Sequence, residues 1–254
     1  MTSNQKPSPC RILVVEDDNR NGAVLRGALA DMGHRIVATR EREEALGRQD
    51  FDEFDLIISD LATQPDANGE VVRSFKIGAA SSGIRCAAST LHKIIHDTLS
   101  VKLKRIDLRE TAAHVREKID LELPSDLSLM NIVLEYLLDR VARMGMIQVE
   151  QSNLFVALDE AFVNAVKHGN RNDPTKLLRV TAELSGHEAT FTVEDEGDGF
   201  DVREIPDPCD PANLFKSSGR GVLLIYNIMD EVEYSQGGAK LKMVKRPESG
   251  WPAR

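Results

Sequence analysis

A carboxylate, a carboxamide and an imidazole recur at four-residue intervals in the segment 158–170, as Glu160, Asn164 and His168. In an α-helix this spacing puts the three side chains on one face, while apolar residues of the segment face the core. A carboxylate beside a carboxamide suits a base next to a Mg²⁺ ligand, because Mg²⁺ takes oxygen ligands and keeps several waters. The alternative is a solvated polar stripe on an amphipathic helix, which this segment alone would favour.

A second group of residues suited to ligand binding follows a predicted strand, in the segment 193–201 (VEDEGDGFD). Asp195 stands at the end of that strand, where its carboxylate could accept a hydrogen bond from an exocyclic amine. Gly197 and Gly199 allow the backbone to turn tightly and to approach a ligand closely. The alternative is an ordinary acidic turn between two strands.

A third segment, 217–225 (SSGRGVLLI), is a glycine-rich loop that opens a predicted helix. Free backbone N–H groups in such a loop, with the helix dipole behind them, make an anion site. The residues concerned are Ser218, Gly219, Arg220 and Gly221. Loops of small residues before helices are frequent, so this motif by itself is weak.

Acidic residues also end two predicted strands near the N-terminus. Glu16 and Asp17 follow the strand 12–15, and Asp60 follows the strand 54–59. In a doubly wound sheet, ligands gather at the carboxyl ends of the strands, so these three carboxylates could share one Mg²⁺.

The elements that position those carboxylates alternate between apolar strands and helices, which predicts a parallel sheet covered on both faces. The expected strands are 12–15, 34–39 and 54–59, and the expected helices are 21–32, 41–49 and 91–104. His92 and His96 fall in the last helix, where we interpret them as part of a partly exposed face rather than as a metal pair or a phosphohistidine site.

The C-terminal half has helices first and antiparallel strands later, which predicts an α/β sandwich whose sheet is covered on one side. The expected helices are 127–143, about 151–168 and one after Gly221, and the expected strands are 177–184, 189–195 and 239–245. The segment 105–117 reads as a charged helical connector. The predicted fold class is therefore α/β and α+β, with a domain at 10–104 and another at 118–247.

The composition is that of an ordinary globular protein, and 254 residues suffice for two domains. A net charge of −9 gives no general attraction to nucleic acid or to an anionic membrane. Three cysteines far apart form neither a disulfide framework nor a zinc site, which favours a reducing compartment. No apolar run approaches the roughly 20 residues of a membrane span, and the leader has no apolar core. We expect a cytoplasmic protein.

The three C-terminal motifs together, DEAFVNAVKHGN, VEDEGDGFD and SSGRGVLLIYNIMDEVEY, resemble the N, G1 and G2 boxes of GHKL-type ATPases. The resemblance covers 118–247 and is strongest to bacterial anti-sigma-factor serine/threonine kinases. The loop 202–218, which is rich in Pro and Asp, is similar to the nucleotide lid of those proteins.

The resemblance implies a role for each motif residue in binding ATP with Mg²⁺. Asn164 would ligate the metal, and Asp195 would accept the adenine amine, with Gly197 and Gly199 shaping that wall. Glu160 would orient or deprotonate the acceptor hydroxyl. The other residues implied in nucleotide binding are His168, Ser218, Gly219, Arg220 and Gly221.

The segment 10–104 resembles the receiver domain of response regulators. Glu16 and Asp17 match the metal-binding acidic pair of that family, and Asp60 matches its phosphoacceptor. The usual Ser/Thr and Lys have no clear counterpart, because the stretch 70–87 is too short for two further helices and strands. Two hypotheses follow for this shortened domain: a switch that takes phosphate, or a docking module that does not.

The predicted function is an ATP-dependent serine/threonine kinase that phosphorylates an anti-sigma-factor antagonist, sequesters a sigma factor and is regulated by the receiver-like domain. The alternative is a non-catalytic ATP-binding module that docks a partner through that domain. Histidine-kinase activity is disfavoured, because no hairpin with a phosphorylatable histidine precedes the ATPase segment. We also expect a homodimer and allow for an upstream histidine kinase.

Overall fold

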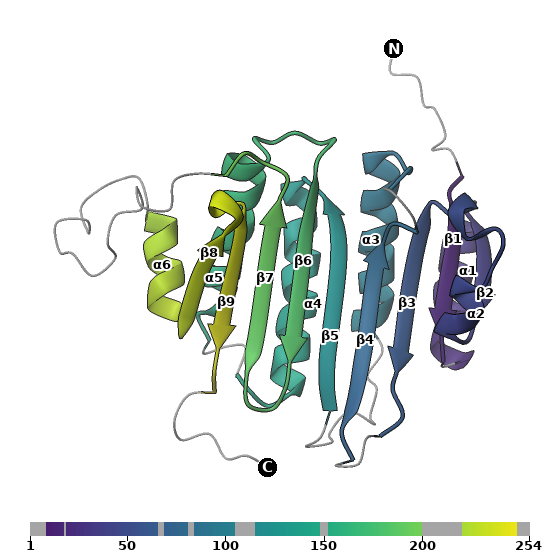
Figure 1. Ribbon diagram of the computed structural model, residues 1–254, viewed down its shortest axis with the longest axis horizontal. Helices are drawn as coiled ribbons and strands as arrows, with labels where there is room; N and C mark the ends of the chain where they lie inside the picture. The colour runs from purple at the N-terminus through teal and green to yellow at the C-terminus, as the bar shows by residue number, and fades with distance from the viewer. Residues whose placement is uncertain are drawn as a thin grey trace.

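A computed structural model of the chain describes residues 9–17, 19–65, 69–80, 84–104, 115–147, 152–199 and 220–247, with the backbone alone at 19–22 and 220. The strands of these segments form one nine-stranded sheet in the order β2-β1-β3-β4-β5-β6-β7-β9-β8. Strands from the N-terminal and C-terminal halves therefore pair within the same sheet, side by side across its full width (Figure 1).

The first three strands are parallel, as the alternation of strands and helices predicts. They are β1 (Arg11–Glu16), β2 (Arg35–Thr39) and β3 (Leu56–Ala62), connected through α1 (Asn19–Asp31), α2 (Arg42–Leu46) and the short η1 (Phe51–Glu53). Residues on both faces of β1 are buried: Ile12 and Val14 belong to the main core, whereas Leu13 and Val15 pack with Phe54 in a smaller cluster.

The parallel arrangement does not continue beyond the third strand, so a receiver-like parallel sheet is not confirmed. The next strand, β4 (Val71–Gly78), was not predicted, and it pairs antiparallel with β3. Only eight residues, 63–70, separate these strands, whereas a parallel connection needs a dozen or more. The chain therefore turns back on itself at this point. The helix α3 (Ala88–Leu103) follows, close to its predicted position.

The two halves join through β5 (Val115–Pro124), which pairs parallel with β4 and antiparallel with β6. The predicted helical connector 105–117 is wrong for 115–117, because these residues begin β5. The rest of that connector lies outside the described residues. The buried Ile119, Leu121 and Leu123 alternate with more polar residues along β5. Such alternation every second residue is typical of a strand that is covered on one face.

The C-terminal elements match the predicted order of helices before antiparallel strands. They are η2 (Leu127–Leu129), α4 (Met130–Arg143), α5 (Leu154–Asn164), the π-helix η3 (Ala165–Gly169), β6 (Leu177–Leu184), β7 (Ala189–Asp195), α6 (Arg220–Ile228), β8 (Glu231–Ser235), η6 (Gln236–Gly238) and β9 (Lys240–Lys245). The strand β8 was not predicted. A mixed α/β fold with a one-sided sheet in this half is confirmed.

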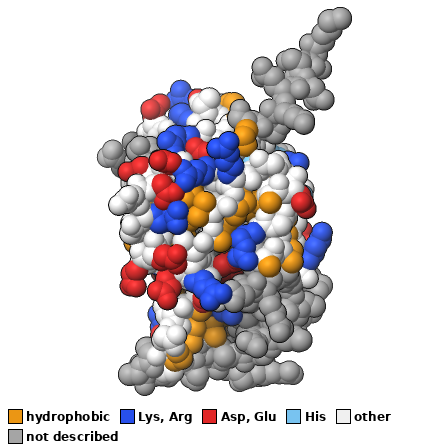
Figure 2. Space-filling view, turned by 90° about the vertical axis from the view of Figure 1, so that its right-hand side faces the viewer, with side chains coloured by type: hydrophobic (Ala, Val, Ile, Leu, Met, Phe, Trp, Pro, Cys, Tyr) orange, Lys and Arg blue, Asp and Glu red, His pale blue; other side chains and the backbone are white. Residues whose placement is uncertain are grey.

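Helices cover mainly one face of the sheet. Residues from α1, α3, α4, α5 and α6 share one continuous hydrophobic core with the strands, whereas α2 packs on the other face beside β1 (Figure 1). The uncovered face is polar: in β6 the buried Leu178 and Val180 alternate with the exposed Arg179 and Glu183. The edge that bears β2, α1 and α2 shows hydrophobic side chains scattered among charged ones (Figure 2).

None of the described helices is both long enough and apolar enough to cross a membrane.

Candidate functional site

The predicted base and metal ligand lie where α5 meets α6. Glu160 and Asn164 stand one turn apart on α5, and Gly221 lies in the first turn of α6. A Cβ built on Gly221 would be 2.2 Å from Glu160 Oε2 and 3.7 Å from Asn164 Nδ2. The two side chains therefore converge on the backbone at the start of α6.

The Asn164 carboxamide has an unusual environment. Its Nδ2 is buried and makes no hydrogen bond to any described residue. A buried donor without a partner costs roughly 1–3 kcal/mol, so this amide group calls for an explanation, and a bound ligand would be one.

His168 does not follow the helical spacing on which its prediction depends. The α-helix ends at Asn164, and residues 165–169 form a π-helix. A π-helical turn changes the angle between successive side chains and is frequent at functional sites. His168 is exposed in this turn, so its role in nucleotide binding stays a prediction.

Asp195 ends β7, as predicted, and lies close against the end of the π-helix. Its Oδ1 accepts a hydrogen bond of 2.8 Å from Gly197 N–H, and a Cβ on Gly169 would be 2.2 Å from its carboxyl carbon. Burial raises the pKa of the Asp195 carboxyl, and the Gly197 N–H bond offsets part of that rise. The carboxylate is therefore held in a tight, partly dehydrated position.

The glycines after Asp195 are required by close backbone contacts. A Cβ on Gly197 would lie 2.2 Å from the Gly169 carbonyl oxygen. Gly199 has a φ of +73°, and a Cβ there would lie 2.0 Å from the Gly237 carbonyl oxygen. Both positions exclude any side chain, which supports the prediction that this turn is shaped for close approach.

Sequence reasoning missed one residue that holds this turn. Asn170 is fully buried; its Nδ2 donates to the Leu177 carbonyl (2.9 Å), and its Oδ1 accepts from Glu196 N–H (2.8 Å). The side chain thus ties the end of the π-helix to both β6 and the turn after β7. The signal was present as an Asn that ends the first motif, but its partners are distant in the sequence.

The third motif is described only in part. Ser218 and Gly219 lie outside the described residues, as does the predicted lid 202–218, and only the backbone of Arg220 is described. Their roles in phosphate binding stay predictions.

Each of the three N-terminal carboxylates has a hydrogen-bonding or ionic partner of its own, although Glu16 lies opposite Asp60 on the neighbouring strand. Glu16 is buried and pairs with Arg26 of α1, while Asp17 Oδ2 accepts a hydrogen bond of 2.8 Å from Ala62 N–H. Asp60 Oδ2 lies 2.6 Å from Lys102 Nζ of α3. Among the described residues, no group of three or more His, Cys, Asp and Glu could hold a metal ion. The predicted Mg²⁺ site at this end stays a hypothesis.

The two acidic regions lie far apart. Strand β3 runs opposite to β7, so their carboxyl ends point to opposite ends of the sheet (Figure 1). Asp60 is in register with Phe191 across four strand spacings, and Asp195 lies four residues further along β7. Standard strand spacings then separate Asp60 from Asp195 by roughly 23 Å.

Comparison with known proteins identifies the C-terminal half. Residues 123–245 match the model of the histidine kinase-like ATPase domain. The anti-sigma F factor of Anoxybacillus flavithermus is 31% identical over 101 residues, which are 38% of this chain and 69% of that protein. The chain belongs to the histidine kinase-like ATPase family.

Kinases of this family are among the relatives. The serine-protein kinase RsbW of Staphylococcus epidermidis is 25% identical over 138 residues, 51% of this chain and 87% of RsbW. RsbW of Staphylococcus aureus strain JH9 is 24% identical over 135 residues, 50% of this chain and 85% of that protein. The family match begins at residue 123, so it includes the Asn164, Asp195 and Gly221 regions and leaves out β1–β4.

Proposed function

We propose that the chain is an ATP-dependent protein serine/threonine kinase of the anti-sigma-factor type. Its substrate would be an anti-sigma-factor antagonist protein, and its sequestered partner a sigma factor. The observation that carries this proposal is the convergence of Glu160 and Asn164 on the Gly221 backbone. The names of the relatives, serine-protein kinase and anti-sigma F factor, support the same class.

The residues present fit ATP with Mg²⁺. Asn164 combines a buried Nδ2 that lacks a partner with an amide oxygen of the kind that Mg²⁺ binds. Asp195 presents an acceptor for the adenine amine beside glycines that leave no room for a side chain. Gly221, with Gly219 and Arg220 before it, would bind the phosphates at the N-terminus of α6.

Glu160 is the proposed base. When bound, ATP with Mg²⁺ would supply the phosphoryl group and the positive charge that offsets its negative charge. Glu160 lies one helical turn from Asn164, which would put its carboxylate near a hydroxyl presented to the γ-phosphate. A carboxylate there orients the Ser or Thr hydroxyl and takes up its proton.

The decisive experiment separates binding from transfer. Glu160→Gln should bind ATP with little change but transfer at least about 100-fold less phosphate to the antagonist. The matched control is Glu183→Gln, because Glu183 lies on the exposed face of β6. An acid-stable phosphate on the partner supports the proposal. An acid-labile phosphate on this chain's own histidines would contradict it.

Nucleotide binding has its own test. Asn164→Ala should remove the metal-dependent part of ATP binding measured by calorimetry, while the fold survives because the amide Nδ2 has no partner to lose. Unchanged Mg·ATP affinity would show that the pocket is assigned to the wrong residues.

The second candidate is a non-catalytic ATP-binding module that docks a partner through its N-terminal half. The observation that favours it is that the Glu16 and Asp60 carboxylates are already engaged by Arg26 and Lys102. Treatment with a small acyl phosphate and Mg²⁺ distinguishes an N-terminal half that takes phosphate from one that only docks a partner. One phosphate that is absent in Asp60→Ala supports a phosphorylated switch, whose donor in the cell would be a histidine kinase. Failure to label supports docking.

The homodimer also remains a proposal, and light scattering of the full chain tests it directly.

A further inference from the structure

Cys10 and Cys86 lie far apart in the sequence but meet in the folded N-terminal half. Cys10 is the residue before β1 and is only 4% exposed, whereas Cys86 stands just before α3 and is partly exposed. Both are free thiols, and a hydrogen bond joins their side chains. Cys86 also packs against the main hydrophobic core, to which Cys10 belongs. The fold therefore holds two sulfur atoms side by side.

The neighbours of both cysteines are anchored to the same carboxylate. Arg11, directly after Cys10, donates its backbone N–H to Asp55 Oδ2 (2.8 Å). The side chain of Arg85, directly before Cys86, places its Nε 3.3 Å from Asp55 Oδ1. The Arg85 Nη2 also donates to two backbone carbonyl groups in the stretch before β3, each at 2.8 Å. The meeting of the two thiols is therefore fixed by several contacts of the residues beside them.

Cys10 is held on its other side as well. Its N–H donates to His34 Nδ1 (3.2 Å), and its carbonyl accepts from the Arg35 N–H (2.9 Å). Cys86, in contrast, lies in the connection before α3 rather than within a helix or strand. Because the sulfurs are already in contact, a small movement of the Cys86 side suffices to reach the S–S length of about 2 Å.

The two thiols differ in acidity and in access to solvent. The hydrogen bond from Cys86 lowers the pKa of the Cys10 thiol, although burial and the Asp55 carboxylate oppose this. The same bond, and then burial, raise the pKa of Cys86, while the Arg85 guanidinium favours a thiolate there. A proton can pass along the S–H···S bond, so the negative charge of the pair can reach Cys86. Cys86 is the sulfur that a reagent from solvent meets first.

We propose that Cys10 and Cys86 form a reversible disulfide by reaction with a small-molecule disulfide. The Cys86 thiolate attacks one sulfur of the small disulfide, whose other half leaves as a thiolate and takes up the proton that the pair has lost. The Cys10 thiol then gives up its proton and attacks the Cys86 sulfur, which releases the second small thiol. Two protein thiols are thereby oxidised to one disulfide, and one small disulfide is reduced to two thiols.

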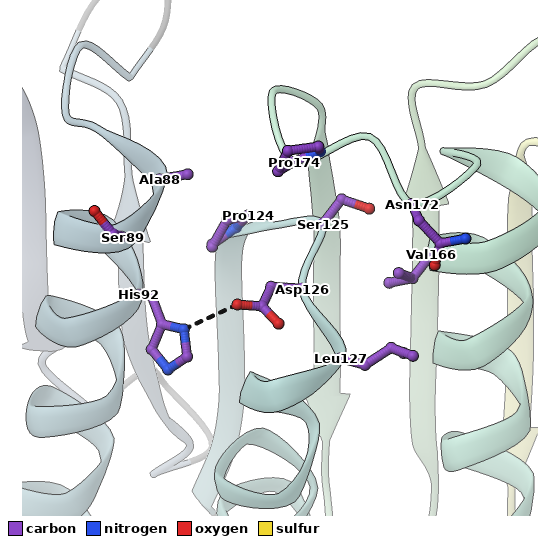
Figure 3. Close-up of a pocket in the computed structure, with 10 residues that line it drawn as sticks. All are labelled: Ala88, Ser89, His92, Pro124, Ser125, Asp126, Leu127, Val166, Asn172 and Pro174. Carbon is purple, nitrogen blue, oxygen red and sulfur yellow. Dashed lines mark hydrogen bonds and ion pairs between the residues drawn. The ribbon is translucent and has the colours of Figure 1, made fainter. Parts of the chain in front are cut away.

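This disulfide would tie the start of α3 to the start of β1. The helix α3 also borders the ATPase half, because His92 Nδ1 of α3 lies 3.1 Å from Asp126 Oδ2 in the turn before α4 (Figure 3). Oxidation would therefore fix the N-terminal end of the helix that lies between the two halves. Closing a long loop of chain also restricts the unfolded state, so the oxidised protein should be the more stable form.

The test uses the full chain with Cys209→Ser, because Cys209 lies outside the described residues and would offer a third thiol. Oxidised glutathione at millimolar concentration should consume both remaining thiols without leaving glutathione attached, and dithiothreitol should restore them. Peptide mapping should find Cys10 joined to Cys86. Oxidation should raise the melting temperature by about 5 °C or more.

Two single variants of the same protein should react differently. In Cys10→Ser, Cys86 should retain one glutathione as a mixed disulfide, because the thiol that would displace it is absent. In Cys86→Ser, Cys10 should stay free, because it is buried. The proposal is overturned if oxidised glutathione leaves both thiols of the folded parent free, or attaches to that protein without joining Cys10 to Cys86. Equal reaction of the two variants, or a lower melting temperature after oxidation, would overturn it as well.

Discussion

The predicted site residues have different surroundings in the two halves of the molecule. In the ATPase half, Asn164 has a buried amide group without a partner, and glycines make contacts that exclude any side chain. In the N-terminal half, Glu16 and Asp60 are each paired with a cation of their own. Both halves have polar residue types of the kind that bind ligands, but among the predicted site residues that the structure describes, Asn164 of the ATPase half is the one with a buried polar atom that lacks a partner.

This difference shows that the type of a residue does not by itself indicate a ligand site, and that its surroundings must be considered as well. Carboxylates at strand ends are consistent with a metal site, yet an adjacent Arg or Lys satisfies the same charge without a metal. A glycine whose Cβ would clash with neighbouring backbone is more informative, because it shows that the local backbone geometry admits no other residue.

The largest effect is expected from Gly197→Ala. The new Cβ would lie 2.2 Å from the Gly169 carbonyl oxygen, and backbone cannot move aside as a flexible side chain can. The turn that holds Asp195 must then shift, so ATP affinity measured by calorimetry should fall by at least about 100-fold.

Gly186→Ala is the matched control, because a Cβ there meets nothing within 4 Å. This variant should bind ATP like the parent protein. If Gly197→Ala retains full affinity, the close packing around Asp195 has no bearing on the nucleotide, and the contrast between the halves fails.

A large loss of stability is expected from Arg140→Met. The Arg140 guanidinium of α4 pairs with Glu117 of β5, with Nε 2.8 Å from Oε2, and both side chains are at most 10% exposed. Removing the cation leaves a buried carboxylate without its main partner, which typically costs about 3–5 kcal/mol. Urea unfolding measures this loss. Arg143→Met, at a more exposed pair with Asp139, should cost well under about 1 kcal/mol.

The sequence predicted most elements of the ATPase half because their periodicity is strong. The strands β6 and β7 have their predicted bounds, and Val133, Leu134 and Leu137 of α4 are buried as their spacing requires. The sequence did not predict β4, whose direction is decided by the short stretch 63–70. It also did not predict β5, whose partners β4 and β6 lie far away in the sequence.

In the candidate site, residues that stand out locally were predictable, whereas contacts between residues distant in the sequence were not. Asp195 and the glycines after it stand out locally, since they end a strand and form a turn. The bracing role of Asn170 was not predictable, because its partners Leu177 and Glu196 come together only in the folded chain. The interruption of α5 by a π-helix was also hidden, and it exposes His168. Likewise, the engagement of Asp60 by Lys102 spans 42 residues.

A smaller effect is expected from Asp195→Asn, which should weaken ATP binding without lowering stability at neutral pH. Burial raises the Asp195 pKa above 3.8, so the ionised carboxylate is disfavoured in the folded state. The protonated carboxyl therefore contributes to folding stability below pH 3.8, and this contribution is lost as the pH rises through the raised pKa of the folded protein. The variant should therefore be at least as stable as the parent at neutral pH, and this advantage should disappear in acid.

The same variant should bind ATP about tenfold more weakly, because the carboxamide is a weaker acceptor for the adenine amine than the carboxylate. Thermal melts across pH and calorimetry with ATP give both quantities on one protein. A variant that is less stable at every pH would show that Asp195 is structural rather than poised for a ligand.

The smallest effect is expected at the Lys102–Asp60 pair, which decides how firmly Asp60 is held in the N-terminal half. The two side chains are 24% and 32% exposed, so water screens their attraction, and Lys102→Met should cost no more than about 1 kcal/mol. Methionine retains apolar contact with the Phe75 ring, over which the Lys102 ammonium lies 4.8 Å from the centroid. A double-mutant cycle with Asp60→Asn isolates the pair, and urea unfolding of all four proteins gives its coupling energy. A coupling below about 1 kcal/mol means that Asp60 is held only loosely and remains available for phosphate. A coupling as large as that of Arg140 with Glu117 would mean that Lys102 holds Asp60 as a structural group, and the N-terminal half would then be a docking module.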